Sequence, residues 1–116
     1  MLLHLVTAEA WAAAPDRPYE APSLAMEGFI HCSPSEEVLL AVANLLYRDE
    51  QGELVVVELD EARVGSEVRW EGPAGPAPTG QEHQLFPHVY GPIDRAAVLA
   101  VRPVRRADDG TFTALG

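Results

Sequence analysis

The chain has 116 residues, of which 47% are hydrophobic and 22% charged, and its formal net charge is −10. A chain of this length can bury a core without disulfides or a structural metal, so we predict a single domain over residues 1–116. The negative charge argues against bulk nucleic acid as a partner, because it repels a phosphate backbone and no basic patch offsets it.

The single cysteine, Cys32, excludes an internal disulfide and a multi-thiolate zinc site, which suits a reducing cytoplasm. The N-terminus has no basic region, and no apolar run approaches the ~20 residues of a membrane-spanning helix. We therefore expect a soluble, cytoplasmic, acidic protein without a membrane partner.

The first part of the chain predicts a strand, a short helix and a loop. The strand covers residues 2–7 and carries His4 in its middle, on a face shared with apolar side chains. Thr7 is expected to cap a short helix over residues 8–14. Residues 16–22 form an irregular loop stiffened by proline, and residues 23–27 lead into the second strand.

Residues 28–37 predict a short strand that runs straight into a capped helix. Ser33 is the expected N-cap, with Pro34 at the first helical position and Glu36 at the third. His31 then lies beside free backbone N–H groups, where a small anion or polar ligand can bind. From this stretch alone, a purely structural interpretation is favoured over a binding site. Helix capping is enough to explain Ser33, and His31 can be a hydrogen-bonded core histidine.

A helix over residues 34–47 is apolar along most of its length and is the expected main core helix. Asn44 interrupts this run and either points outward or hydrogen-bonds to a neighbouring element. Residues 53–60 predict the central strand, since they are apolar from Val55 to Val57. Residues 67–71 alternate in polarity and predict a half-buried strand.

Residues 72–84 are rich in proline and glycine and predict a long loop, which in a small domain is often functional or mobile. A short aromatic strand follows at residues 85–92, and a last strand at residues 98–104. The core is therefore expected over about residues 2–104. Residues 105–116 are a polar tail in which residues 111–115 can add an edge strand.

The four histidines are the first candidates for chemistry. Two of them, His31 and His88, lie at strand ends beside loops, and His4 lies within a strand. The spacing typical of a zinc site is absent, so we expect no metal. Cys32 is expected to be buried and inert, because neighbours on a strand face opposite sides. No glycine-rich dinucleotide fingerprint, phosphate loop or nucleophile elbow occurs.

The carboxylates give a weaker signal. Glu58 and Asp60 share one face of the central strand, and Glu71 closes the next strand where the proline-rich loop begins. An acid at a strand end can be held for proton transfer or for binding a ribose, although surface glutamates are frequent in this chain.

The whole pattern resembles a small bacterial family known as domain of unknown function number 952. The match runs from Leu2 to about Val104, and its blocks around His31 and His88 are specific. The resemblance is carried by His4, Trp11, Tyr19, Ser23-Leu24, residues 27–33, Ala43-Asn44 with Tyr47, Trp70-Glu71 and residues 86–92.

That family is in turn distantly similar to the ADP-ribosyltransferases, which hold NAD in a cleft of a split β-sheet. The similarity implies that His4 contacts the NAD ribose, and that His31 with Ser33 lines the nicotinamide pocket. It also implies an acid on a later strand, within or near residues 86–90, where this chain has His88 and Tyr90 and only Glu82 upstream. A phosphate-transferring relative without the acid would need arginines, for which Arg17, Arg48 and Arg69 are the candidates.

We therefore predict an α+β single domain with a mixed, strongly bent or split β-sheet and one main helix, resembling an ADP-ribosyltransferase. The predicted function is an NAD- or ADP-ribose-binding enzyme, with NAD as a possible ligand rather than an assured cofactor. The alternative is a non-catalytic domain that binds a small molecule or nucleotide, or another protein. The predicted catalytic residues are His4, His31 and His88, and the predicted ligand-binding residues are Ser33, Tyr90, Asn44, Tyr47 and Glu71.

Overall fold

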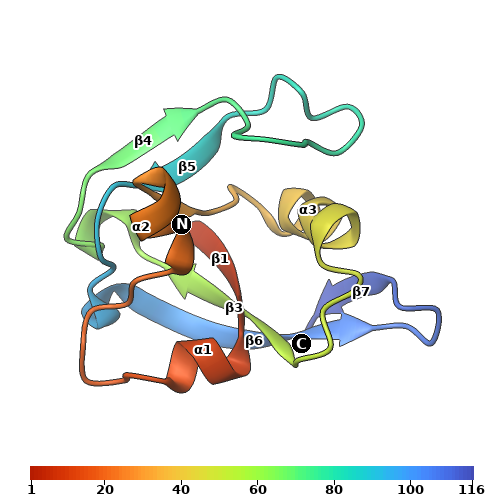
Figure 1. Cartoon of the computed structure of the whole chain (residues 1–116), viewed down its shortest axis with the longest axis horizontal. Helices are drawn as coiled ribbons and strands as arrows, with labels where there is room; N and C mark the ends of the chain where they lie inside the picture. Colours follow the sequence, from red (N-terminus) through yellow and green to blue (C-terminus); the bar gives the residue numbers. More distant parts are fainter.

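The computed structural model describes residues 1–116 and contains seven strands in two antiparallel sheets (Figure 1). The first sheet has four strands in the order β1-β3-β6-β7. Its members are β1 (Leu2–Thr7), β3 (Leu54–Leu59), β6 (Val98–Arg106) and β7 (Phe112–Leu115). The inner position of β3 confirms the central strand expected from its continuous apolar run. Its first four residues are all buried, so both faces of the strand are covered there.

The second sheet has three strands in the order β2-β5-β4. These are β2 (Ile30–His31), β5 (Phe86–Val89) and β4 (Val68–Glu71). All pairings in both sheets are antiparallel, so the α+β class and the split sheet are confirmed but the sheets are not mixed. The edge strand expected near the C-terminus is present as β7.

A bridge just after β2 joins the two sheets. The backbone N–H of Leu3 donates to the Ser33 carbonyl at 2.9 Å, and the Ser33 N–H donates to the Leu3 carbonyl at 2.7 Å. The connection fixes the chain between β2 and the next helix against the edge of β1. The backbone of Ser33 is thereby held in place independently of any helix cap.

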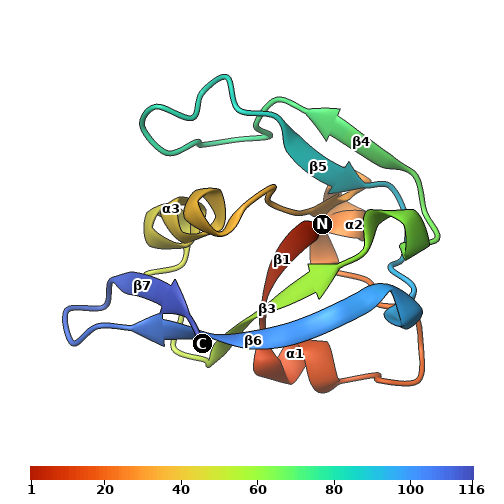
Figure 2. The ribbon, with the colours of Figure 1, turned by 180° about the vertical axis from the view of Figure 1, so that it is seen from behind.

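The helices are α1 (Ala8–Ala12), α2 (Pro22–Glu27) and α3 (Glu36–Leu46), with 3₁₀ turns at Glu61–Arg63 and Arg95–Ala97. Helix α3 packs against the first sheet, and Figures 1 and 2 show the long loop after β4 extending above it. None of these helices combines the length and the apolarity needed to cross a membrane.

The N-cap of α3 corrects the sequence prediction. Ser35, not Ser33, is the cap, and its Oγ accepts a hydrogen bond from the Val38 N–H at 3.2 Å. The helix therefore begins two residues later than expected, and Pro34 precedes it. Because Ser33 is released from capping, the purely structural explanation of its hydroxyl no longer applies.

Helix α2 occupies residues for which only a connection to the second strand is predicted from the sequence. Its start and stop signals are present: Pro22 stands in the first turn, and Gly28 ends the helix with φ at 91°. Proline is pre-organised for a first turn, and glycine adopts the left-handed region without strain. The helix matters for the site because it carries Ser23 and Glu27.

The main core lies between the two sheets. Its largest cluster has 13 buried residues, including Leu2 and Val57 from the first sheet and Ile30 and Val89 from the second. Of the 26 buried residues only three are polar, namely His4, Ser33 and His88. Buried polar groups are costly unless bonded or used, so these three positions require a specific explanation.

Asn44 hydrogen-bonds to a neighbouring element, which is one of the two alternatives left open by the sequence. Its amide Nδ2 donates to the Phe112 carbonyl at 2.9 Å, and its Oδ1 accepts from the Phe112 N–H at 2.8 Å. The side chain thus bonds to the backbone of β7 as a neighbouring strand would, and it links α3 to β7.

We predict that Asn44→Ala lowers the free energy of unfolding by about 2 kcal/mol, because the partly buried Phe112 backbone groups lose their partners. Urea unfolding measures this. Gln51→Ala is the control, since the Gln51 amide makes one exposed bond to the Asp49 carbonyl and its loss should change stability by under ~0.5 kcal/mol. Equal stability of the two variants would contradict the structural role.

Candidate functional site

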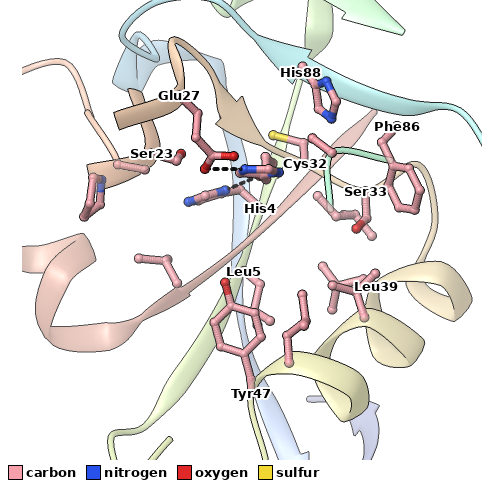
Figure 3. Close-up of a pocket in the computed structure, with 18 of the residues that line it drawn as sticks. His4, Leu5, Ser23, Glu27, Cys32, Ser33, Leu39, Tyr47, Phe86 and His88 are labelled. Atoms are coloured by element: carbon pink, nitrogen blue, oxygen red, sulfur yellow. Dashed lines mark hydrogen bonds and ion pairs between the residues drawn. The ribbon is translucent and has the colours of Figure 1, made fainter. Parts of the chain in front are cut away.

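A cavity of about 560 Å³ lies where the two sheets face each other, and 24 residues line it. The lining comes from β1, α2, the segment around β2, α3, β5 and the long loop after β4. In Figure 3, His4, Glu27 and His88 lie toward one end of the cavity, and Leu39 and Tyr47 lie toward the other. We call the group of His4, Glu27, His31 and His88 the polar end.

His4 is held at both ring nitrogens. Its Nδ1 lies 2.7 Å from the His31 carbonyl, and its Nε2 lies 2.9 Å from the Tyr19 hydroxyl. A carbonyl can only accept, so Nδ1 carries the proton and donates to it. Nε2 then accepts from the Tyr19 O–H.

Burial keeps both members of this pair neutral. It lowers the pKa of His4 to about 4, and it raises the pKa of Tyr19 to about 12. At neutral pH, His4 is therefore an uncharged imidazole in one fixed tautomer. Its bond to the His31 carbonyl links the first sheet to the second, and its bond to Tyr19 links the first sheet to the loop between α1 and α2.

His31 stands on the open side of the polar end. Its Nε2 lies 3.0 Å from a Glu27 carboxylate oxygen, and the two side chains are 43% and 44% exposed. The left-handed turn at Gly28 follows Glu27 and returns the chain toward β2, which brings the acid beside the imidazole. An exposed pair of this kind contributes little to stability.

His88 is buried and bonds to a partly exposed polar group on the second sheet. Its Nδ1 lies 2.8 Å from Glu71 Oε1, and the Tyr90 hydroxyl donates to the same oxygen at 2.6 Å. The hydrogen bonds from Tyr90 and then His88 lower the pKa of Glu71, and the bond to Glu71 raises the pKa of Tyr90. Glu71 is thus a carboxylate that accepts from both neighbours, so the Nδ1 of His88 is the donor.

The second ring nitrogen of His88, Nε2, has no hydrogen-bond partner within the chain, and His88 lines the cavity. The ring is otherwise packed: Phe29 stacks on it at 4.3 Å between centroids, and the His31 ring meets it edge-on at 5.6 Å. A carboxylate behind an imidazole fixes its tautomer and orientation, which is how a general base is positioned.

The remaining predicted site residues divide into two groups. Ser33 and Tyr47 line the cavity, and neither hydroxyl bonds to another residue of the chain. Glu71 and Tyr90 lie behind His88 rather than in the lining. Cys32 is buried, and burial raises the pKa of its thiol to about 12, in agreement with the inert cysteine expected.

Sequence reasoning missed three contributors, which are Tyr19, Glu27 and Phe29. Their partners lie on other elements or across a turn, so strand periodicity carries no sign of the contacts. One signal was available: all three belong to the residues that carried the family resemblance, and two of them flank Gly28 beside His31.

The carboxylate beside His88 comes from a neighbouring strand rather than from residues 86–90. Glu71 reaches His88 because β4 and β5 are antiparallel neighbours, in which Arg69 is opposite His88 and Glu71 is opposite Phe86. Diagonal neighbours on one sheet face are within reach of long side chains. Glu82 does not take this role, since it accepts from the Gly80 N–H in the loop.

The arginines expected for a phosphate-transferring site do not line the cavity. Arg48 donates to the Asp109 carbonyl, and Arg69 pairs with Glu67 and lies over the Tyr90 ring. Arg17 is likewise absent from the lining. No group of three or more histidine, cysteine, aspartate or glutamate side chains is arranged to hold a metal ion.

Comparison with known proteins places the chain in a family. The family described as "Protein of unknown function (DUF952)" matches residues 5–101. This chain belongs to that family. No curated protein matches it.

Solved structures match over almost the whole chain. The crystal structure of CC0527 from Caulobacter crescentus is 24% identical, with a TM-score of 0.75 over 97% of this chain and 92% of that one. The solution structure of the same protein has a TM-score of 0.72 and covers 97% and 90% of the two chains. A likeness at this identity shows a shared fold.

We predict that His4 makes stability fall with acidification. Its pKa is about 4 when folded and near 6.5 when unfolded, so the unfolded chain binds more protons between these values. Its contribution is complete above about pH 6.5 and falls by about 3 kcal/mol as the pH drops toward 4. Urea unfolding from pH 7 to pH 4 should show a smaller loss for His4→Gln than for the unmodified protein.

His83→Gln is the control for this measurement, because His83 is exposed in the loop after β4. It should keep the full pH dependence. If His4→Gln lost stability with acidification as steeply as the His83 variant does, the claim that His4 is a buried, neutral imidazole would be contradicted.

Proposed function

We propose that this chain is an enzyme that cleaves the N-glycosidic bond of NAD or a related pyridinium riboside, with an ADP-ribosyltransferase-like site. The observation that carries the proposal is the Glu71–His88 pair, whose free imidazole nitrogen meets a cavity between two sheets. Histidines from three strands, β1, β2 and β5, meet around that cavity. The split sheet and the family resemblance support the same reading.

Each polar group has a role that its geometry supports. His88 Nε2 acts as the general base, since Glu71 holds the proton on Nδ1. His4 is neutral and fully bonded, so it shapes the cavity and positions the backbone of His31. The free hydroxyls of Ser33 and Tyr47 are available to a ribose or a carboxamide.

The reaction balances with water or an acceptor hydroxyl as the nucleophile. The nucleophile's oxygen bonds to C1′ of the ribose, and its proton goes to His88 Nε2. The C1′–N bond breaks, and its electron pair leaves with the pyridine, which departs neutral because its nitrogen was cationic. Negative charge from Glu71 stabilises the imidazolium that forms.

The cavity's size suits this substrate class. Its volume of about 560 Å³ lies within the range of roughly 300–1,000 Å³ common for small-molecule sites. Aromatic and aliphatic side chains, including Phe86 and Leu39, give the surface on which a flat ring can pack.

The non-catalytic binding domain is the second candidate, and the long loop favours it. Pro73, Pro76 and Pro78 from this loop line the cavity, so the loop presents a stiff apolar wall to any ligand. Binding without turnover would identify the chain as such a domain.

We predict that NAD or nicotinamide riboside is converted to free nicotinamide, and that His88→Asn lowers the turnover rate by about 10²–10⁴ while affinity changes much less. Glu71→Gln should also lower the turnover rate, because the tautomer of His88 is no longer fixed. Glu53→Gln, a substitution at an exposed residue just before β3, is the matched control and should keep full activity. Nicotinamide release is followed by chromatography.

Binding is measured beside turnover by calorimetry and by the shift in melting temperature. A ligand at a hundredfold excess over its dissociation constant adds about 2.7 kcal/mol of stability. The proposal would be overturned by nicotinamide release that is unchanged in His88→Asn, or by the absence of release with every substrate.

A further inference from the structure

We infer that the cavity selects the cationic, phosphate-free member of its substrate class, a pyridinium riboside, over the corresponding nucleotide and dinucleotide. The inference rests on the proposed function and adds a substrate preference to it. The observations that carry it are the charges at the cavity and the positions of the arginines.

Glu27 is the only acid in the cavity lining, and no arginine lines it. Its carboxylate is almost half exposed on the open side of the polar end, next to His31. The Glu27 carboxylate therefore gives the lining a negative charge that no arginine or lysine side chain offsets. A cationic ring is attracted to such a site, whereas a phosphate is repelled.

No cationic side chain other than a histidine stands in the lining of the cavity. The chain has no lysine, and its eight basic residues are all arginines. Arg95 donates to the carbonyls of Trp11, Ala14 and Arg17, and Arg102 pairs with Glu58. A diphosphate entering this cavity would meet neither a guanidinium nor an ammonium group, although these groups usually hold phosphates in proteins.

The start of α3, which the sequence analysis considered as an anion site, is also unfavourable for a phosphate. Glu36 and Glu37 occupy its first turn, and Ser35 already bonds to the N–H of Val38. These carboxylates offset the partial positive charge of the helix start. The net charge of −10 adds long-range repulsion of anions.

The experiment compares the dissociation constants of nicotinamide riboside, nicotinamide mononucleotide and NAD by calorimetry at low ionic strength, with nicotinamide release measured in parallel. The riboside should bind at least tenfold more tightly than the other two. In Glu27→Gln, which can still accept a hydrogen bond from His31, that preference should shrink severalfold. Asp108→Asn removes one charge from the exposed turn before β7 and should leave the preference unchanged.

The two proposals fail in different ways. Mononucleotide or NAD bound as tightly as the riboside, or a preference equal in Glu27→Gln and Asp108→Asn, would overturn the charge selection and leave the proposed reaction standing. If none of the three compounds bound or released nicotinamide, the proposed function would fail, and the substrate preference with it.

Discussion

The two hydrogen bonds of His4 are the constraint on which the site depends. One joins its Nδ1 to the His31 carbonyl, and the other joins its Nε2 to the Tyr19 hydroxyl. Because His4 lies on the first sheet and His31 on the second, the imidazole sets how the sheets meet. Beside it, the backbone of Ser33 is fixed by the bridge to Leu3. A shift of β2 relative to β1 would break the bond between His4 and the His31 carbonyl together with the bridge between Leu3 and Ser33, and would leave polar groups without partners.

This arrangement separates a rigid part of the cavity from an accessible part. His4 and His88 are buried and oriented by neighbours, whereas His31 and Glu27 are exposed at the open side. Fixed donors and acceptors cost little reorganisation during a reaction, which suits proton transfer. The accessible carboxylate of Glu27 suits recognition of a positively charged ligand. The proposed reaction and the proposed preference for a cation therefore use different residues of one cavity.

The sequence was most informative where a local pattern decides the structure. The apolar run of β3 predicted its central place, and the alternation of side chains along a strand predicted that Cys32, next to His31, is buried. It was least informative for contacts between distant elements. The bond between Glu71 and His88 depends on the register of β4 against β5, and Tyr19 reaches His4 from a loop. The cap prediction failed because Ser33 and Ser35 both flank Pro34, and the bridge that engages Ser33 with Leu3 is a contact between distant parts of the sequence.

The most direct test of this account is the protonation of the histidine rings, measured by nitrogen-15 NMR of the labelled protein at pH 7. We predict that His4 is neutral with its proton on Nδ1 and stays neutral down to about pH 5, because burial lowers its pKa to about 4. We also predict that the Nδ1 of His88 is protonated. A proton on Nε2 of neutral His4, or an imidazolium at pH 7, would contradict the link between the sheets and the site built on it.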